Sequence, residues 1–215
     1  MPRSQLRRSD SKIDMSSVFR LCDQLPPDIN SQTLFGNDQP LELEVGSGKG
    51  LFIQTASAAN PETNFLGIEV AKKYAELAAT KLAAENRTNA IMAAGDALPV
   101  IENQIAANSL EAIHVYFPDP WWKKRHRKRR VVNEHTIAHY SRALRPGGRL
   151  HFWTDVLDYF EPTVELIAEF APELGVPIPE EEAESTHDLD YRTHFERRSR
   201  KYNIPVYRVR YVKRV

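Results

Sequence analysis

Short apolar stretches recur along the chain, and longer amphipathic segments separate them. The apolar stretches predict five strands, over residues 41–45, 64–68, 89–94, 112–117 and 149–153. The segments between and after them have helical spacing of apolar residues, over residues 51–59, 71–85, about 98–107, 133–144 and about 158–170. Strands that alternate with helices form parallel pairs, so the pattern predicts an α/β fold with a doubly wound, mainly parallel sheet.

The two ends of the chain depart from this alternation. Residues 206–212 read VYRVRYV and alternate strictly, which predicts a last, antiparallel strand with one basic face. Residues 1–14 are polar and basic, and the segment that follows contains Pro26-Pro27 and other turn-forming residues up to Pro40. We therefore expect residues 1–40 to be a flexible basic arm and linker with a short element over residues 18–25, and residues 41–215 to be one domain.

A glycine loop, Gly46-Ser47-Gly48-Lys49-Gly50, joins the first predicted strand to the first predicted helix. Its spacing is that of neither a dinucleotide-binding loop nor a P-loop. Glu44 precedes the loop, where an acid would repel a pyrophosphate but suits a cofactor with a positively charged amino-acid end, such as S-adenosylmethionine. A simple tight turn from strand to helix is the alternative for this loop taken alone.

Four acids lie at the carboxyl ends of predicted strands, namely Glu69, Asp96, Asp119 and Asp155. In an open parallel sheet these ends meet at one edge, where ligands bind. We expect Glu69 to accept hydrogen bonds from ribose hydroxyls and Asp96 to accept one from an adenine amino group. One such acid would be an ordinary solvated strand end, but the set together with the glycine loop favours a methyl-donor site.

Residues 115–132, VYFPDPWWKKRHRKRRVV, are the most unusual stretch of the chain. A predicted strand ends at Pro118-Asp119-Pro120, two tryptophans follow, and seven Lys or Arg lie within residues 123–130. Taken separately, a basic run is usually a solvated face and a tryptophan is usually packed. Here aromatic faces that stack on bases stand beside cations that neutralise phosphates, and the combination favours chemistry on a nucleic acid.

The charge totals hide a segregated arrangement. The 29 basic and 29 acidic side chains cancel, yet residues 150–191 contain no Lys or Arg, and basic residues concentrate in 123–130 and 192–214. A neutral chain of this kind can still present a positive surface to a polyanion.

Cysteine and histidine usage and hydropathy exclude several classes of protein. With Cys22 as the only cysteine, an intrachain disulfide or a cysteine-based metal site is impossible. His135 and His139 have helical i, i+4 spacing but neither Cys partners nor an intervening Glu, so we expect no metal. No apolar run is long enough to span a bilayer, and we expect a cytoplasmic protein without a membrane partner.

Four motifs in matching order resemble the bacterial tRNA (guanine-N7)-methyltransferases, from about residue 41 to residue 215. They are Glu44-Val45-Gly46-Ser47-Gly48-Lys49-Gly50, Phe117-Pro118-Asp119-Pro120-Trp121 with its basic tail, Arg145-Pro146-Gly147-Gly148 with Thr154-Asp155, and Thr193-His194-Phe195-Glu196. The resemblance implies a Rossmann-like, S-adenosylmethionine-dependent enzyme that methylates N7 of guanine at position 46 of tRNA.

The resemblance also implies roles for particular residues. The methyl donor would be bound by Glu44, Gly46, Gly48, Glu69, Asp96 and Asp119. The target nucleotide would be faced by Lys123, Asp155, Thr193 and Glu196.

The chemistry of the reaction agrees with these residue types. Guanine N7 carries an exposed lone pair, so no proton has to be removed before it attacks a methyl group. Asp119 is the expected catalytic residue, through orientation of the guanine and stabilisation of developing positive charge, and not as a general base.

The basic residues would hold the tRNA backbone. The expected phosphate patch is Lys124, Arg125, Arg127 and Lys128. A second patch is expected at Arg192, Arg197, Arg198, Arg200 and Lys201. One of Trp121 and Trp122 would be packed and the other available to stack on a base.

Three other functions compete with this one. An amino-directed base methyltransferase would carry a second proline where Asp119-Pro120-Trp121 has tryptophan. A non-catalytic RNA-binding scaffold would be expected to have lost the acids or glycines of the donor site, and all are present. A dinucleotide-dependent oxidoreductase is disfavoured by the loop spacing. Monomer and homodimer both remain open.

Overall fold

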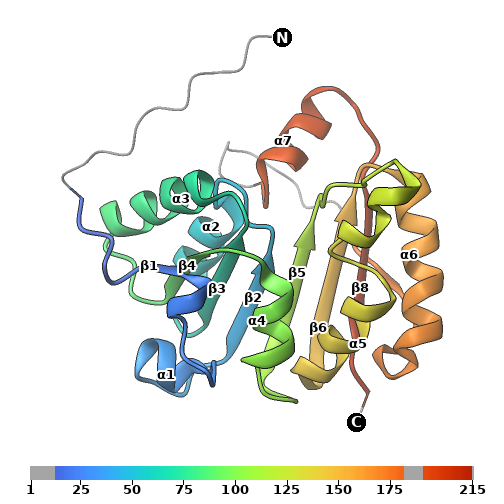
Figure 1. The fold of residues 1–215 in the computed structure, drawn as a ribbon. Helices are drawn as coiled ribbons and strands as arrows, with labels where there is room; N and C mark the ends of the chain where they lie inside the picture. Colours follow the sequence, from blue (N-terminus) through green and yellow to red (C-terminus); the bar gives the residue numbers. More distant parts are fainter. Residues whose placement is uncertain (1–12, 182–190, 215) are drawn as a thin grey trace.

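The computed structural model describes residues 13–181 and 191–214, which form one eight-stranded sheet with helices on both faces (Figure 1). The strand order is β1-β4-β3-β2-β5-β6-β8-β7. The strands are β1 (Phe19–Leu21), β2 (Leu41–Val45), β3 (Asn64–Glu69), β4 (Ala90–Ala94), β5 (Leu110–Tyr116), β6 (Leu144–Thr154), β7 (Ile178–Pro179) and β8 (Tyr207–Val212). The α-helices are α1 (Ser31–Phe35), α2 (Leu51–Ala59), α3 (Lys72–Ala84), α4 (Ala97–Asn103), α5 (Glu134–Ala143), α6 (Leu157–Phe170) and α7 (His194–Lys201).

Two apolar cores lie on opposite faces of the sheet. Side chains of α4, α5 and α6 pack with Leu43, Ile113 and Phe152 on one face. Side chains of α2 and α3 pack with Phe65 and Met92 on the other. The six strands from β1 to β6 pair in parallel, and β8 pairs antiparallel with both β6 and β7. The predicted fold class, a doubly wound and mainly parallel sheet with an antiparallel last strand, is confirmed.

The five predicted parallel strands are all present, and the largest shift concerns β6. This strand begins at Leu144 and not at Arg149, because Leu144 pairs with Leu110 before the register shifts. The segment Arg145-Pro146-Gly147-Gly148, expected as a turn, is thus an irregular start of the strand. Short strand β7, in the acidic segment after α6, was not predicted.

The predicted linker before residue 41 is wrong for the part nearest the domain. Strand β1 pairs in parallel with β4, and Val18, Leu25 and Ile29 are buried. Asn30 caps the short helix α1. Three residues of strand are too few to show a period of two, so the sequence indicated a short element over residues 18–25 but not that it is a strand at the edge of the sheet. Residues 1–12 of the predicted arm lie outside the described residues.

Within residues 13–181 and 191–214, every helix is too short or too polar to cross a lipid bilayer.

Candidate functional site

The glycine loop is held in place by an acid from the next strand. The backbone N–H of Gly48 donates to Oε2 of Glu69 at 2.8 Å, and Oε1 of Glu69 accepts from the N–H of Ala71 at 2.8 Å. Gly50 has φ +72°, and a Cβ there would lie 2.4 Å from the Cβ of Ala78, so α2 and α3 approach closely only because residue 50 is glycine. The predicted contact of Glu69 with ribose hydroxyls stays a prediction, and the lone pairs that remain on the carboxylate allow it.

Glu44 is a buried acid with no ion-pair partner among the described residues. Only 3% of it is exposed, and its Oε2 has no hydrogen-bond partner among the described residues. Burial raises the pKa of the Glu44 carboxyl to about 8. A buried unpaired carboxyl is costly, and at the carboxyl end of a strand it is poised to receive a positively charged ligand group.

Two cavities meet at the glycine loop. The larger, of about 350 Å³, lies between the loop and α7. The smaller, of about 160 Å³, lies between the loop, the end of β4 and the start of α5. Of the predicted donor residues, Glu44 and Gly48 line the first cavity, Asp96 lines the second, and Gly46 lines both. The structure therefore brings these four together, with Glu69 behind the loop.

Helix α7 forms a wall of the larger cavity. Thr193 and Phe195 line the cavity, and the hydroxyl of Thr193 caps the helix by accepting from the N–H of Glu196 at 3.0 Å. Phe195 stacks on Phe117 with ring centroids 5.9 Å apart. Helix α7 lies above the carboxyl edge of the sheet (Figure 1).

Glu196 itself is directed into the protein and is only 2% exposed. Its carboxylate accepts from the N–H of Arg192 at 2.7 Å and from Arg200 at 2.9 Å, and it lies 3.5 Å from Arg208. These contacts fix the start of α7 on the sheet. The predicted contact of Glu196 with guanine stays a prediction, and the structure gives this acid a structural role.

Asp119 lies in a strained loop at the end of β5. It is exposed, and its Oδ1 accepts from the N–H of Trp121 at 3.1 Å. Phe117 and Trp121, on either side, have φ of +50° and +44°. Bulky residues rarely adopt this conformation, which costs on the order of 1–3 kcal/mol each and concentrates at functional sites.

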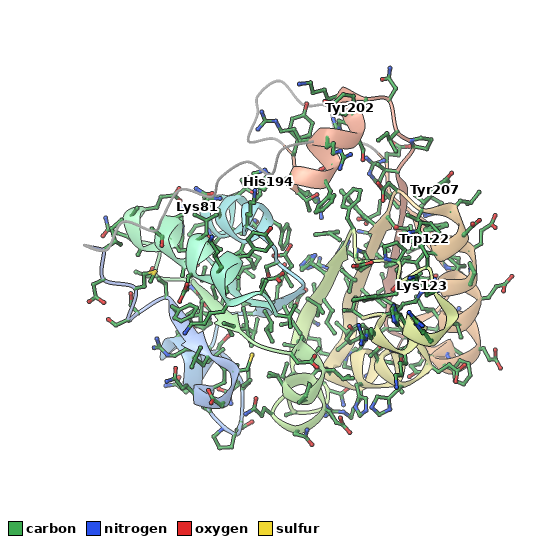
Figure 2. All side chains as sticks on the ribbon, turned by 45° about the horizontal axis from the view of Figure 1, so that its top comes forward. Lys81, Trp122, Lys123, His194, Tyr202 and Tyr207 are labelled. Atoms are coloured by element: carbon green, nitrogen blue, oxygen red, sulfur yellow. The ribbon has the colours of Figure 1, made fainter. Side chains whose placement is uncertain are left out.

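The remaining predicted nucleotide contacts are at the same edge but outside the cavities. Asp155 directly follows β6 and is exposed, as is Lys123. Trp121 is half-buried beneath Arg129, whereas Trp122 is 62% exposed. Figure 2 shows Trp122 and Lys123 on one side of the edge, and His194 with Lys81 on the other. Trp122 is therefore the tryptophan available to a base.

Two basic surfaces lie near the glycine loop, one beside each cavity: Lys128 and Arg129 line the smaller cavity, and α7 forms a wall of the larger. The first is the 3₁₀ helix Lys124–Arg129, in which Arg125 and Lys128 are described; the side chains of Lys124 and Arg127 lie outside the described part of the structure. The second is the outer face of α7, which exposes Arg197, Arg198 and Lys201. Arg192 and Arg200, which were expected in this patch, point inward to protein partners.

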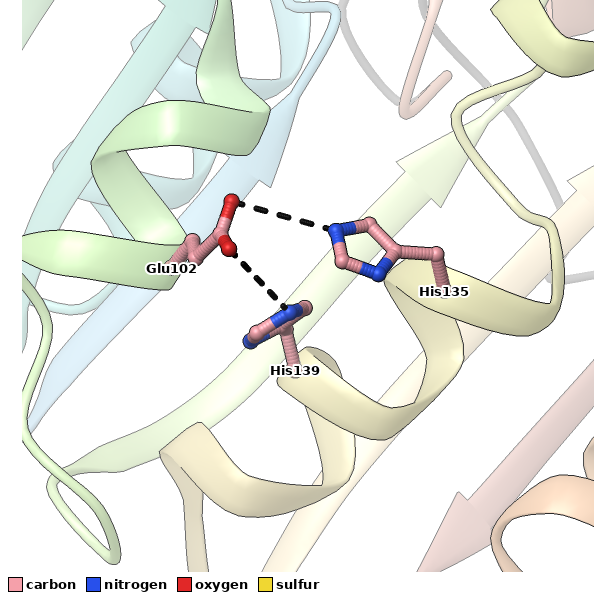
Figure 3. Close-up of side chains that lie close together, drawn as sticks. All are labelled: Glu102, His135 and His139. Carbon is pink, nitrogen blue, oxygen red and sulfur yellow. Dashed lines mark ion pairs between the residues drawn. The ribbon is translucent and has the colours of Figure 1, made fainter.

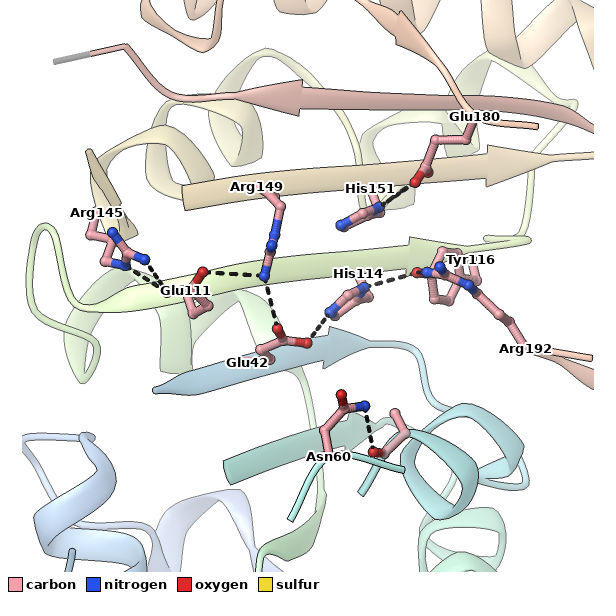
Figure 4. A network of polar contacts seen from close by, with 11 residues as sticks. Glu42, Asn60, Glu111, His114, Tyr116, Arg145, Arg149, His151, Glu180 and Arg192 are labelled. Carbon is pink, nitrogen blue, oxygen red and sulfur yellow. Dashed lines mark hydrogen bonds and ion pairs between the residues drawn. The ribbon is translucent and has the colours of Figure 1, made fainter. Parts of the chain in front are cut away.

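A polar network connects the interior of the sheet to α7 (Figure 4). Nε2 of His114 lies 2.8 Å from Glu42, Nδ1 of His114 lies 2.8 Å from the hydroxyl of Tyr116, and Arg192 donates to that hydroxyl at 2.8 Å. Burial lowers the pKa of His114 to about 4, more than the bond to Glu42 raises it. A neutral ring makes both hydrogen bonds with one tautomer: Nε2–H donates to Glu42, and Nδ1 accepts from the hydroxyl of Tyr116.

The network is anchored by further pairs. Arg149 lies 3.2 Å from Glu42 and 3.1 Å from Glu111. On β6, His151 stacks on His114, and Glu180 accepts from Trp153 at 2.7 Å. Burial would raise the pKa of Glu180, but the bonds from His151 and Trp153 hold it at about 2.

Sequence reasoning missed Tyr116 and Phe117 as cavity walls, and it did not predict that Phe117 stacks on Phe195. The first two end a strand whose other residues are core, and their apolar character carried no functional signal. The Phe117-Phe195 stack joins residues 78 positions apart, and no local pattern indicates it.

Comparisons with known proteins agree with this geometry. A family model described as "Putative methyltransferase" matches residues 38–209. A tRNA (guanine-N(7)-)-methyltransferase of Rhodopirellula baltica is 64% identical, over all of this chain and 81% of the relative. One of Listeria monocytogenes is 33% identical over 86% of each chain. The solved structure of the 16S rRNA methyltransferase KamB shares the fold, with a TM-score of 0.60 at 15% identity over 91% of this chain and 98% of that one. The chain belongs to the tRNA (guanine-N7)-methyltransferase family.

Proposed function

We propose that this protein transfers a methyl group from S-adenosylmethionine to N7 of a guanine in tRNA, at position 46 in the variable loop. The observation that carries the proposal is the buried carboxyl of Glu44 beside the glycine loop, whose Oε2 has no hydrogen-bond partner among the described residues. That carboxyl suits the positively charged amino group at the methionine end of the donor.

Each of the two cavities would hold one end of the donor. Glu44, Gly46 and Gly48 would hold the amino-acid end in the larger cavity, where backbone turns leave space and Glu44 supplies charge. Asp96 in the smaller cavity would hold the adenine end, and Glu69 the ribose between them. When bound, S-adenosylmethionine supplies an electrophilic methyl carbon on a sulfonium.

The protein's part in the reaction is orientation and electrostatics. Guanine N7 needs no deprotonation, so Asp119 acts by holding the purine and by stabilising the positive charge that develops on it. The left-handed backbone at Phe117 and Trp121 fixes the loop that carries Asp119. Asp155 and Thr193 would contact the guanine edge, and Lys123 its phosphate.

The substrate is held by charge outside the cavity. The 3₁₀ helix Lys124–Arg129, beside the smaller cavity, and the outer face of α7, beside the larger, would contact tRNA phosphates. Trp122 would stack on an exposed base. We place the reaction in the cytoplasm, where unmodified tRNA is found.

Methyl transfer to a modified transcript tests the proposal. Labelled S-adenosylmethionine is incubated with the protein and with tRNA transcripts that carry either guanine or 7-deazaguanine at position 46. We expect label on the guanine transcript and none on the deaza transcript, because carbon replaces the nucleophilic nitrogen. Equal labelling of both would reject N7 at position 46, and labelling of neither would reject the activity.

The same assay tests Asp119. The variant Asp119→Asn keeps the size of the side chain and removes its charge, so we expect turnover to fall about 100-fold or more while tRNA binding is retained. Unchanged turnover would remove Asp119 from the mechanism.

A further inference from the structure

Three potential metal ligands meet on the surface between α4 and α5 (Figure 3). Glu102 comes from the last turn of α4, and His135 and His139 come from successive turns of α5. The i, i+4 spacing places both imidazoles on one face of the helix. Glu102 lies on a helix more than thirty residues earlier in the chain, so the sequence alone showed only the pair of histidines.

The spacing of the three groups leaves room for an ion. Nε2 of His135 lies 3.8 Å from Glu102 and Nε2 of His139 lies 3.9 Å from it, which is too long for hydrogen bonds. All three ligand atoms lie within 4.8 Å of one another. Donors that share one tetrahedral Zn²⁺ stand about 3.3 Å apart, so small side-chain rotations close the site. The side chains of Glu102 and His135 are exposed, so they have room for these rotations.

The ring of His139 is oriented as a metal ligand would be. Nδ1 of His139 is buried without a hydrogen-bond partner among the described residues, and the other ring nitrogen points at Glu102. Imidazole nitrogen is a common ligand for transition metals, so this ring can bind an ion through the nitrogen that faces Glu102.

The two helices are already locked in this arrangement. Arg142, one turn beyond His139, donates to the carbonyl oxygens of Ile105 at 2.8 Å and Ile101 at 2.6 Å. These bonds tie α5 to the end of α4 on either side of Glu102. The site therefore requires no movement of the backbone to form.

We propose that Glu102, His135 and His139 form a binding site for a divalent transition-metal ion of the Zn²⁺ class, with solvent completing the coordination. Two imidazoles and one carboxylate, with an open position, suit Zn²⁺, Co²⁺ or Ni²⁺ and not Mg²⁺, which prefers oxygen ligands. The ion would bridge α4 and α5, which both contribute walls to the smaller cavity through Ala97 and Thr136.

Titration of the full-length, untagged and metal-stripped protein with Zn²⁺ tests the site. Isothermal calorimetry should show one ion per chain, and Co²⁺ should give a visible absorption band of a bound ion. Millimolar Mg²⁺ should not compete. The double variant His135→Ala/His139→Ala should bind Zn²⁺ at least about 10-fold more weakly and lose the Co²⁺ band. The single variant Glu102→Gln should weaken binding in the same direction.

The control is Glu134→Gln, an exposed acid on α5 that is not among the three ligands. It should bind like the unmodified protein. All three ligand side chains reach the surface, so the variants should fold, which circular dichroism checks. Equal Zn²⁺ binding by the folded double variant and the unmodified chain would overturn the proposal, as would absence of binding by the unmodified chain.

Discussion

At the scale of the residue, the site depends on a carboxyl that is unfavourable for the empty protein. Glu44 is buried at the end of β2 with one oxygen unpaired, and its raised pKa of about 8 reflects that burial. Functional sites commonly hold such groups, whose cost is recovered when the ligand binds. Replacing the Glu44 carboxyl by a neutral group should therefore stabilise the ligand-free protein and lower its affinity for the methyl donor.

The variant Glu44→Gln should stabilise the ligand-free protein at high pH. Because the pKa of Glu44 is raised on folding, the stability linked to its proton is present below about pH 4.5 and is lost as pH rises through about 8. Glutamine stays neutral, so the difference in melting temperature between variant and unmodified protein should grow from pH 5 to pH 9. Affinity for S-adenosylmethionine should fall about 10- to 100-fold, as expected for a lost charged hydrogen bond.

The matched control is Glu165→Gln, an exposed acid on α6. Its melting temperature should differ from that of the unmodified protein by a constant amount across the same range. A Glu44→Gln variant that behaves in the same way, and that binds the donor normally, would show that Glu44 is not the group that receives the donor's charge.

At the scale of the element, the hydroxyl of Tyr116 joins the sheet to α7. It lies between His114 on β5 and Arg192, which directly precedes the cap of α7 at Thr193. The aromatic ring of Tyr116 also lines the larger cavity. One side chain thus links the position of α7 to the shape of the cavity.

Tyr116→Phe should lower stability and turnover together. The change removes the hydroxyl that Nδ1 of His114 and the guanidinium of Arg192 both contact, in a largely buried place, which costs about 1–3 kcal/mol. Urea unfolding would measure that loss. Because Arg192 sets the start of α7, kcat should fall more than tRNA affinity. The control is Tyr211→Phe, since the hydroxyl of Tyr211 is buried without a hydrogen-bond partner among the described residues. Its removal should be neutral or stabilising, and an equal loss in both variants would contradict the role of the network.

The elements that were predictable from sequence are those with many residues in one pattern. Helix α2 has the predicted bounds, and α5 begins one residue after its predicted start, where Asn133 caps it. Strand β1 was not predictable because three residues carry no period, and its burial depends on pairing with β4.

The residues of the candidate site divide in the same way, into those that a local pattern indicates and those that packing brings together. Glu44 and Asp96 follow from strand ends, whereas the inward turn of Glu196 and the meeting of Glu102 with His139 depend on packing between distant segments.

At the scale of the whole molecule, a neutral chain presents cations at one edge of its sheet. The outer face of α7 and the 3₁₀ helix Lys124–Arg129 both lie there, while the acidic residues from β6 to β7 carry the compensating charge. Attraction to a polyanion depends on this local arrangement and not on the total.

The double variant Arg197→Ala/Lys201→Ala should bind tRNA more weakly and with a weaker salt dependence. Loss of two phosphate contacts should reduce the slope of log K against log salt by about 1.5. Filter binding over a range of salt concentrations measures the slope. Arg214→Ala, after the end of β8 at the opposite edge, should leave it unchanged. An unchanged slope in the double variant would mean that α7 does not contact phosphates.

Helix α7 carries exposed cations on its outside and cavity-lining side chains, Thr193 and Phe195, on its inside. Under the proposed function, a rigid helix with two such faces would couple the two ligands, because tRNA phosphates that fix the helix from outside would also fix the wall of the cavity that holds the methyl donor. Coupling between two ligands is reciprocal, so a bound methyl donor would raise the affinity for tRNA by the same factor by which bound tRNA raises the affinity for the donor. The eight residues of α7 would thus make the enzyme favour a ternary complex over either binary one.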